Sequence, residues 1–400
     1  MKIVADTNIP LLEDAFGPLG DVVAVPAGEI TPERVADADA LLVRSVTRVG
    51  GELLDASSVR FVATATIGLD HVDRAYLAAR GIGFASAQGS NARSVAEYVL
   101  AALSVLAARR GARMSQQVLG VVGVGNVGGR LARMAEALGM TVLRNDPPLA
   151  RRTGDPCYVP IDALADADVV TLHVPLTHEG PEATFHMVDE RLLARFKEGV
   201  TLVNTSRGAV ADSQALKAAI GTGFFGPVAL DVWENEPNID GQLLGPVDLA
   251  TPHVAGYSYD GKVNGTRMVR EALCRHFGLQ REWDPTPLMP PPPHPYVALP
   301  AGLTVDEAVR GAIAATYDIE ADDARLREMA EAPAAERGGY FTSLRRNYPV
   351  RREFPHTNIE LTAPDSDVET ALRSIDFPVS IAPPGRTSAG PPGAAQRGMP

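Results

Sequence analysis

The stretch from Gly120 to Pro148 constrains the fold of this chain more than any other part of its sequence. It reads GVVGVGNVGGRLARMAEALGMTVLRNDPP, with small and β-branched residues before three glycines and apolar residues at helical spacing after them. A second strand-like run, residues 140–143, then ends at Asn145 and Asp146. Strand, glycine turn, helix and strand in this order are the parts of a βαβ unit that binds a dinucleotide. We therefore predict a parallel sheet with a nucleotide site where the helix begins.

Each glycine of the motif has its own physical task. Gly123 permits the tight turn, Gly125 lets backbone amides approach a pyrophosphate, and Gly128 lets the helix pack closely on the strand. Asn126 and Val127 lie in the first turn of the helix, whose unpaired amides point at the phosphates. These five residues are the predicted phosphate-binding part of the cofactor site.

The acidic residue at the end of the second strand indicates which dinucleotide is bound. The Asp146 carboxylate can accept hydrogen bonds from both ribose hydroxyls, and it would repel a 2′-phosphate. NAD is therefore favoured over NADP, although Arg144, Arg151 and Arg152 are close enough in sequence to weaken that preference. A glycine triplet alone is weak support, because ordinary glycine-rich turns share it. The strand, the helix and the acid together carry the prediction.

The whole chain has the size and composition of a multidomain globular protein. Its 400 residues and 45% hydrophobic content suffice for two or three domains. A net charge of −12 argues against a general nucleic-acid or anionic-membrane binder, because phosphate contacts need a concentrated basic face. The start of the chain has no basic and hydrophobic leader, no apolar stretch is long enough to span a bilayer, and the two cysteines lack metal-type spacing. We expect a cytoplasmic protein without a bound metal ion.

Strand-like runs alternate with helical patterns before the glycine motif as well. IVAD, ALLV and FVATATI alternate with LLEDAF, TPERVADA and DHVDRAYLAARG, which predicts a first parallel sheet. Ligands of such sheets bind beyond the carboxyl ends of the strands, which directs attention to Arg44, Ser45 and residues 64–68. Arg44 can hold an anion and Ser45 can donate to one. A surface arginine and a turn serine are an equally good interpretation of this pair alone.

Three residues of different chemistry follow strand-like runs after the motif. Arg207, in NTSRGAV, keeps its charge and can clamp a carboxylate in bidentate fashion. Glu236 follows another run, in LDVWENEP, and His253 follows a third, in ATPHVAGYS. A carboxylate that holds an imidazole raises the imidazole pKa, so His253 could exchange a hydroxyl proton while a hydride moves to or from nicotinamide. The three residues together predict a dehydrogenase active site.

Two further polar residues at strand ends receive weaker assignments. His173, in HVPLT, lies at the predicted sheet edge, where a lone histidine is more often structural than catalytic. We assign it no chemistry. Asp231 is interpreted as a polar strand-end residue that faces the cofactor.

These segments resemble the D-isomer-specific 2-hydroxyacid dehydrogenase family over about residues 1–280, and more loosely over 290–375. The pieces that carry the resemblance are LLVRSVT, FVATATIGLDHVD, QGSNARSVAEYV, GVVGVGNVGGRL followed by NDPP, HVPLTHEG, NTSRGAV, LDVWENEP and TPHVAGYS. The resemblance implies that Arg207 and Glu236 are active-site residues and that His253 is the acid/base.

The resemblance also implies contacts to substrate and cofactor. The implied substrate-binding residues are Ser45, Thr66 and Tyr257, and the implied NAD-binding residues are Asp146, Val174, Asp231 and Gly256. Threonine is common in the family at the position of Val174, so only a backbone contact is expected there.

The family fold implies an α/β protein with two doubly wound parallel-sheet domains and a small C-terminal α/β dimerisation domain. We expect residues 1–95 plus 257–284 to form the substrate-binding (catalytic) domain and residues 96–256 to form the Rossmann-type NAD domain inserted into it. Residues 285–302 contain PTPLMPPPPHP and are expected to be a linker, followed by the dimerisation domain over 303–381. Residues 382–400 lack apolar periodicity and are expected to be disordered. The implied assembly is a homodimer.

The RSVT, GSNA and DPP segments and the tyrosine of HVAGYS point to one branch of this family. Its reaction is oxidation of 4-phospho-D-erythronate to (R)-3-hydroxy-2-oxo-4-phosphooxybutanoate in pyridoxal 5′-phosphate biosynthesis. His253 would take the C2 hydroxyl proton, and Arg207 would hold the adjacent carboxylate. Two alternatives stay open: a dehydrogenase of another 2-hydroxy acid, such as 3-phosphoglycerate, and an NAD-sensing protein of the corepressor type.

A basic cluster near the C-terminus is unusual in so acidic a chain. It comprises Arg345, Arg346, Arg351 and Arg352. One or more of these arginines could reach the substrate phosphate. A solvated loop or an intersubunit ion-pair patch is an equally good interpretation.

Overall fold

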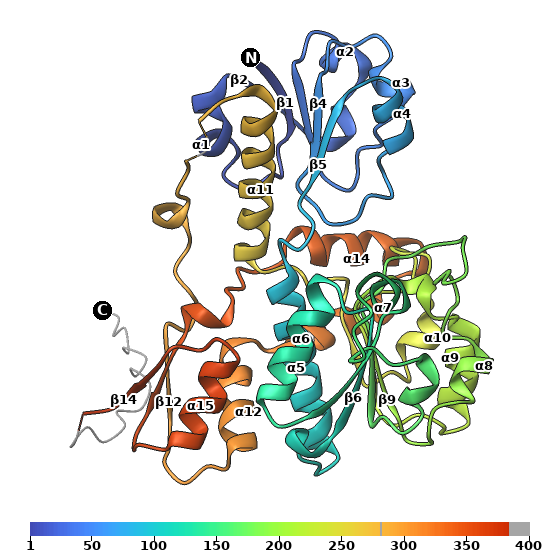
Figure 1. Cartoon of the computed structure of the whole chain (residues 1–400), viewed down its shortest axis with the longest axis vertical. Helices are drawn as coiled ribbons and strands as arrows, with labels where there is room; N and C mark the ends of the chain where they lie inside the picture. The colour runs from blue at the N-terminus through green and yellow to red at the C-terminus, as the bar shows by residue number, and fades with distance from the viewer. Residues whose placement is uncertain (281, 384–400) are drawn as a thin grey trace, which may run out of the picture.

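The computed structural model describes residues 1–280 and 282–383, which contain three sheets built from parallel strands (Figure 1). The sheets succeed one another along the chain, and helices pack against them. This arrangement confirms the predicted α/β class. Most of the expected disordered tail, residues 384–400, lies outside the described residues.

The first sheet has the strand order β2-β1-β3-β4-β5, all parallel. Its strands are β1 (Lys2–Asp6), β2 (Asp21–Val25), β3 (Ala40–Val43), β4 (Phe61–Thr64) and β5 (Gly83–Ser86). Its short helices are α1 (Leu12–Phe16), α2 (Pro32–Val35), α3 (Gly51–Leu54) and α4 (Arg74–Ala79). A distant helix, α11 (Tyr259–Phe277), returns to this sheet and inserts Val269 and Leu273 into the core around Ile3 and Phe16. The first domain is therefore completed by chain from beyond the second.

The second sheet has the order β11-β10-β9-β8-β6-β7, so the chain changes direction beside β6 as in a doubly wound fold. Its strands are β6 (Val118–Val122), β7 (Thr141–Asn145), β8 (Val169–Leu172), β9 (Thr201–Asn204), β10 (Val228–Leu230) and β11 (Leu249–Ala250). Its helices include α6 (Asn126–Ala137), α7 (Pro147–Thr153), α8 (Glu190–Leu193), α9 (Ser213–Gly221) and α10 (Gly241–Leu244). The long helix α5 (Ala92–Arg109) leads into it from the first domain and packs on α6.

The third sheet is small, with the order β12-β13-β14. It comprises β12 (Tyr296–Leu299), β13 (Asn358–Leu361) and β14 (Val379–Ile381), with α12 (Val305–Thr316) and α15 (Ser366–Ser374). β12 lies within the segment expected to be a linker, because Val297 and Leu299 pack on the core while β12 pairs with β13. The domain boundaries themselves remain predictions.

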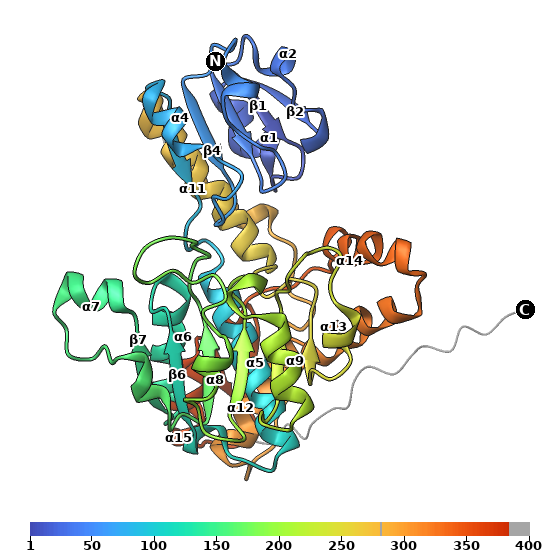
Figure 2. The same cartoon turned by 90° about the vertical axis from the view of Figure 1, so that its right-hand side faces the viewer.

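The chain between α12 and β13 forms an arm along the nucleotide-binding domain. Its helices are α13 (Ile319–Arg327) and α14 (Arg337–Arg346). Leu326 and Phe341 are buried in the same core as strands of the second sheet, so the arm is a packed part of that domain. Figure 1 shows α14 between the first domain and the second, and Figure 2 shows it at the same level from the side. The C-terminal part of the chain thus reaches the place where the two larger domains meet.

No helix within the described residues is long and apolar enough to cross a membrane. In the same part of the chain, no group of three or more histidine, cysteine, aspartate or glutamate side chains is placed to hold a metal ion.

Candidate active site

The glycine motif has the geometry that its sequence predicts. Gly123 has φ +85°, a left-handed conformation that favours glycine, and the turn that it forms joins β6 to α6. A β-carbon on Gly128 would lie 2.0 Å from the Gly123 carbonyl oxygen, so α6 can approach the turn only without a side chain there. Beside Gly125, by contrast, a β-carbon would meet no atom within 4 Å, which leaves open space where α6 begins. This open helix N-terminus fits a pyrophosphate.

Asp146 lies directly after β7, beside the same turn. Its Oδ2 accepts a hydrogen bond from the Val124 amide at 2.9 Å, and its Oδ1 accepts one from the Leu149 amide at 2.9 Å. The carboxylate therefore fixes the glycine turn and caps α7. Each carboxylate oxygen can still accept a further hydrogen bond. This position fits the predicted contact to ribose hydroxyls.

Two of the arginines that could have favoured a 2′-phosphate already have acidic partners. Arg144 donates to Glu136 at 2.6 Å, and Arg151 pairs with Glu182. The strand-end acid and these occupied guanidinium groups together fit NAD better than NADP.

Three other predicted cofactor residues, Asn126, Val127 and Val174, lie at or beside this turn. Val174 packs against Gly123, and Val127 is partly buried in the core beneath α6. The Asn126 side chain lies beside Gly89. Gly256 lies farther along the chain, and its carbonyl accepts from Asn91 Nδ2 at 3.4 Å.

His253 and Glu236 form a hydrogen-bonded pair on the loops that follow β11 and β10. His253 Nδ1 lies 2.7 Å from Glu236 Oε2, and the other carboxylate oxygen accepts from the Trp233 amide at 2.8 Å. An ionised Glu236 can only accept, so it selects the tautomer with the proton on Nδ1 and leaves Nε2 free to accept one. The His253 side chain is 32% exposed and that of Glu236 is 19% exposed. The imidazole can therefore meet a substrate while its partner stays shielded.

The charges around Glu236 keep it ionised. Burial would raise the pKa of Glu236, but the facing His253, the hydrogen bonds from its ring and from the Trp233 amide, and the charge of Arg345 together lower that pKa below its ordinary value. Glu236 is thus suited to stabilise an imidazolium on His253.

Asp231 positions the loop that carries His253. Its Oδ1 accepts from the Thr251 hydroxyl at 2.6 Å and from the Val254 amide at 2.7 Å, and its Oδ2 accepts from the Ala255 amide at 3.0 Å. His253 has φ +58°, an uncommon conformation for a residue with a side chain, and these bonds hold it there. Burial raises the pKa of Asp231 despite the bonds. Its contact with NAD remains a prediction, whereas its positioning role was not anticipated from the sequence.

Arg207 extends from the second domain to the first. Its guanidinium lies 3.7 Å from Asp70 Oδ2, beside Gly68, and donates to the Ser206 carbonyl at 2.8 Å. Asp70 is 73% exposed, so this pair is weak and can yield to a substrate carboxylate. The loop after Arg207 also packs directly on the Trp233 backbone, which places it beside the segment that carries Glu236.

The three predicted substrate residues lie at different depths. Ser45 is exposed in the turn after β3, and the Thr66 hydroxyl lies 2.7 Å from that of Thr64 at the end of β4. Tyr257 follows the His253 loop, and its ring lies beside Lys262 and Arg345. The structure places Tyr257 next to cations, but it records no direct contact among Ser45, Thr66 and Tyr257 within the described residues.

Two neighbouring histidines serve as comparisons for His253. Burial lowers the pKa of His173 to about 3, and its ring nitrogens contact the hydroxyls of Thr171 and Thr205, which agrees with a structural role. His186 pairs with Glu234 at 2.7 Å. The motif WENEP therefore holds two glutamates that contact different histidines: Glu234 contacts His186, and Glu236 contacts His253.

The four arginines of the basic cluster separate into different environments. Arg351 is buried and donates to the Ser94 and Ala255 carbonyls, and Arg352 is buried and pairs with Asp260 at 2.9 Å. Arg346 lines a cavity of about 430 Å³ between α14 and the loop at Pro237. Arg345 alone faces the ring of Tyr257, with its guanidinium carbon 5.5 Å from the ring centroid.

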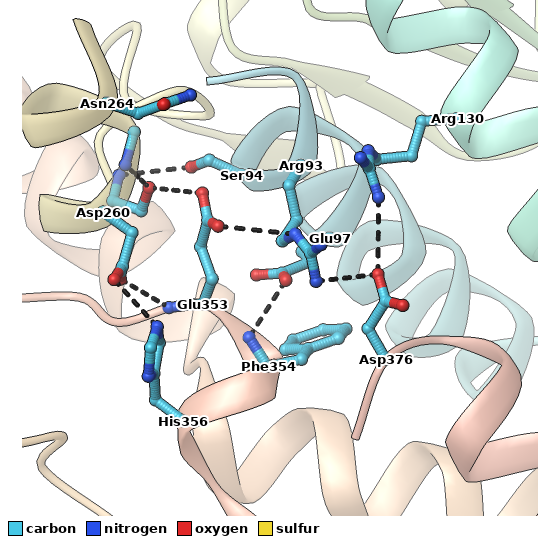
Figure 3. Close-up of polar contacts among 12 residues, drawn as sticks. Arg93, Ser94, Glu97, Arg130, Asp260, Asn264, Glu353, Phe354, His356 and Asp376 are labelled. Carbon is cyan, nitrogen blue, oxygen red and sulfur yellow. Dashed lines mark hydrogen bonds and ion pairs between the residues drawn. The ribbon is translucent and has the colours of Figure 1, made fainter. Parts of the chain in front are cut away.

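Buried carboxylates join the C-terminal module to the start of α5 and α11, as Figure 3 shows. Asp260 accepts from the Arg352 guanidinium, the His356 ring and the Glu353 amide. Glu353 accepts from the Ser258 hydroxyl at 2.8 Å, and the Phe354 amide donates to Glu97 at 2.9 Å. The other Glu97 oxygen is buried and has no hydrogen-bond partner among the described residues. The module that carries α14 is therefore fixed to the site by polar contacts.

Comparison with known proteins relates this geometry to a family. The NAD-binding domain of the D-isomer specific 2-hydroxyacid dehydrogenases matches residues 91–255, and a domain of unknown function, DUF3410, matches residues 288–375. The solved structure of the TT0316 protein from Thermus thermophilus has a TM-score of 0.60 and 28% identity, over 70% of this chain and 98% of that chain.

Two curated relatives are similar along almost their whole length. One is the erythronate-4-phosphate dehydrogenase of Salinibacter ruber (strain DSM 13855 / M31), 50% identical over 93% of this chain and 97% of the relative. The other is the erythronate-4-phosphate dehydrogenase of Marinobacter nauticus (strain ATCC 700491 / DSM 11845 / VT8), 46% identical over 95% of this chain and 100% of the relative.

Proposed function

Since the chain belongs to the D-isomer-specific 2-hydroxyacid dehydrogenases, and within them to the family of erythronate-4-phosphate dehydrogenases, we propose that its substrate is 4-phospho-D-erythronate. The product would be (R)-3-hydroxy-2-oxo-4-phosphooxybutanoate, an intermediate on the way to pyridoxal 5′-phosphate. The chain contains the NAD-binding domain of the family, and bound NAD supplies the hydride acceptor. The observation that carries the proposal is the His253–Glu236 pair, which lies beyond the carboxyl ends of the strands in that domain.

The side chains divide the work between proton transfer and orientation. His253 Nε2 accepts the C2 hydroxyl proton, and Glu236 stabilises the imidazolium that forms. Arg207 binds the substrate carboxylate in bidentate fashion and so orients the C2 carbon beside it. In the reverse direction His253 returns the proton to the oxygen of the 2-oxo acid.

The proposal extends to a homodimer in the cytoplasm. β12 and β14 are the two edges of the third sheet, and each exposes an apolar side chain, Tyr296 at 74% and Ile381 at 39%. Exposed edge strands with apolar side chains are typical pairing surfaces, which supports the dimer. A cytoplasmic location fits the NAD that the reaction consumes.

The test is a substrate comparison with the purified protein. NADH fluorescence is followed with 4-phospho-D-erythronate, 3-phosphoglycerate and D-lactate, and a parallel sample contains a 2-oxo acid to reoxidise tightly held NADH. We expect preference for 4-phospho-D-erythronate and loss of turnover in His253→Asn, since asparagine tolerates the left-handed backbone at this position. Turnover of another acid alone would contradict the substrate. Binding of NADH without turnover of any acid would favour a sensor.

A further inference from the structure

Two cationic side chains from distant parts of the sequence lie against the ring of Tyr257. Lys262, near the start of α11, places its Nζ 4.4 Å from the centroid of the Tyr257 ring, and Arg345, near the end of α14, places its guanidinium carbon 5.5 Å from it. Arg44, after β3, acts on Lys262 as a neighbouring positive charge, as does Arg345. Two cations from different parts of the fold therefore share the Tyr257 ring, and a third, Arg44, adds its charge to their surroundings.

No carboxylate in the described part of the chain forms an ion pair with this cluster. Arg44, Lys262 and Arg345 make no ion pair with a carboxylate there, although arginines nearby, such as Arg352, do. The Arg44 side chain donates to the Asn8 carbonyl at 3.3 Å, and the Arg345 Nε is buried with no hydrogen-bond partner in residues 1–280 and 282–383. Like charges repel, and a buried donor without a partner costs free energy. A cluster of this kind is expected to bind an anion.

The environment of Lys262 supports the same conclusion. Burial, together with the charges of Arg44 and Arg345, lowers the pKa of Lys262 to about 8. A lysine in such surroundings lacks the counter-charge that would keep it protonated, and a bound dianion would supply it. Arg345 also contributes to lowering the pKa of Glu236, so the cluster adjoins the catalytic pair.

We propose that Arg44, Lys262 and Arg345 form the subsite that binds the 4-phosphate of the substrate. A phosphate monoester carries a charge of about −1.5 to −2 at pH 7 and offers three acceptor oxygens, which suits a group of several cationic side chains. Arg207 then serves the carboxylate at the other end of the substrate. The inference rests on the proposed function, because that function supplies the phosphorylated 2-hydroxy acid.

The proposal assigns a task to the C-terminal domain of unknown function. Its arm places Arg345 against the Tyr257 ring, and it directs Arg346, the next residue, toward the cavity between α14 and the loop at Pro237. Tyr257 holds the pair of cations on its ring, and the Tyr348 ring packs edge-on against it at 5.7 Å. Tyr348 in turn donates to Asp322 of the arm at 2.7 Å. The position of Arg345 thus depends on the packing of this domain.

The first test compares Arg345→Gln with Arg346→Gln, in full-length protein with NADH bound. The dissociation constants of 4-phospho-D-erythronate and D-erythronate are measured by titration, so the readout does not require turnover. We expect Arg345→Gln to weaken the phosphorylated ligand about 10- to 100-fold, as for loss of a charge-assisted hydrogen bond, and to leave D-erythronate unchanged. Arg345→Lys should recover part of the loss, and Arg346→Gln should bind both ligands like the unmodified protein.

Other results would overturn the subsite. It fails if Arg345→Gln weakens both ligands equally, if Arg346→Gln is equally harmful, or if the unmodified protein binds D-erythronate as tightly as its phosphate ester. If Arg345→Gln does not fold, the same two dissociation constants are measured for Lys262→Gln. Lys262 lies in α11, outside the C-terminal arm.

The proposed function can fail separately from the subsite. In that event the unmodified protein would bind 4-phospho-D-erythronate through Arg345 but would not oxidise it. Conversely, oxidation of this substrate with equal binding of the two ligands would support the function and reject the subsite.

Discussion

The two sides of the active site are built in different ways. The cofactor side comes from one short run, residues 118–146, in which a turn, a helix start and a strand end are adjacent in sequence and in space. The proposed acid-binding side combines Arg44, Arg207, His253, Lys262 and Arg345, which lie on elements from three parts of the fold. Backbone geometry governs the first side, whereas side-chain charge brought together by long-range packing governs the second.

The largest expected effect tests the cofactor side, which depends on backbone geometry. Gly128→Ala places a β-carbon 2.0 Å from the Gly123 carbonyl oxygen, a backbone atom that cannot move without opening the turn. We expect a loss of about 2–4 kcal/mol in the free energy of unfolding and greatly weakened NADH binding, measured by denaturant titration and fluorescence. Gly129→Ala is the matched control, since its β-carbon would lie 3.3 Å from the Val124 carbonyl oxygen and alanine favours a helix. Equal losses in both variants would contradict the steric explanation.

The next largest effect tests the acid-binding side, through the proton transfer assigned to His253. Glu236→Gln removes the charge that supports a protonated His253, so we expect kcat to fall about 100-fold or more while NADH affinity is retained. Glu234→Gln, two residues away and paired with His186, should change kcat little. A larger loss of kcat in Glu234→Gln than in Glu236→Gln would indicate that His186, and not His253, is the acid/base.

The pH dependence of the two Michaelis constants also distinguishes the substrate side from the cofactor side. Lys262 has a pKa of about 8, so it is charged below that pH and becomes neutral above it. We expect the KM for 4-phospho-D-erythronate to rise as the pH increases through about 8, and the KM for NAD to stay flat over the same range. In Lys262→Gln the substrate KM should start high and lose this rise. A parallel rise in both Michaelis constants would contradict the assignment of the cation to the substrate side.

The smallest effect concerns the junction that fixes the arm. Burial and the nearby Glu353 raise the pKa of Glu97 well above its usual value, so the folded protein holds a proton that the unfolded chain releases. The stability due to this group is complete at low pH and is lost as the pH rises toward the folded-state pKa. We expect Glu97→Gln to raise the Tm relative to the unmodified protein, and the difference to grow as the pH rises above the ordinary glutamate pKa of about 4.3. Glu369→Gln, in an exposed helical ion pair, should show no such trend.

The difference between the two sides also explains what could be read from the sequence. The βαβ unit and the strand ends bearing Glu236 and His253 follow from local pattern, and the structure then places these two side chains 2.7 Å apart. Local sequence pattern does not identify Lys262 as a site residue. The helical pattern is recognisable from Gly265 onward, whereas α11 begins at Tyr259, because Gly261 and Asn264 have weak helix propensity and hide its first turns.

Other features depended on contacts between distant residues. The sequence contains four arginines between 345 and 352, and only tertiary packing distinguishes Arg345 from its neighbours. Asp231 was expected to face the cofactor, and the structure shows both of its oxygens on the loop of His253, a role that composition and spacing do not reveal. Similarly, β12 follows a run of prolines, and it becomes a strand because β13 pairs with it.

The return of α11 to the first sheet has a consequence for synthesis on the ribosome. Val269 and Leu273 complete the core around Ile3 and Phe16, yet the chain over 92–258 must be translated before they exist. At about 5–20 residues per second, this interval lasts roughly 10–30 s. During it the nascent first sheet exposes an apolar face that the finished protein hides. This face is a natural binding surface for chaperones, and a chain that terminates before residue 259 would be prone to aggregate.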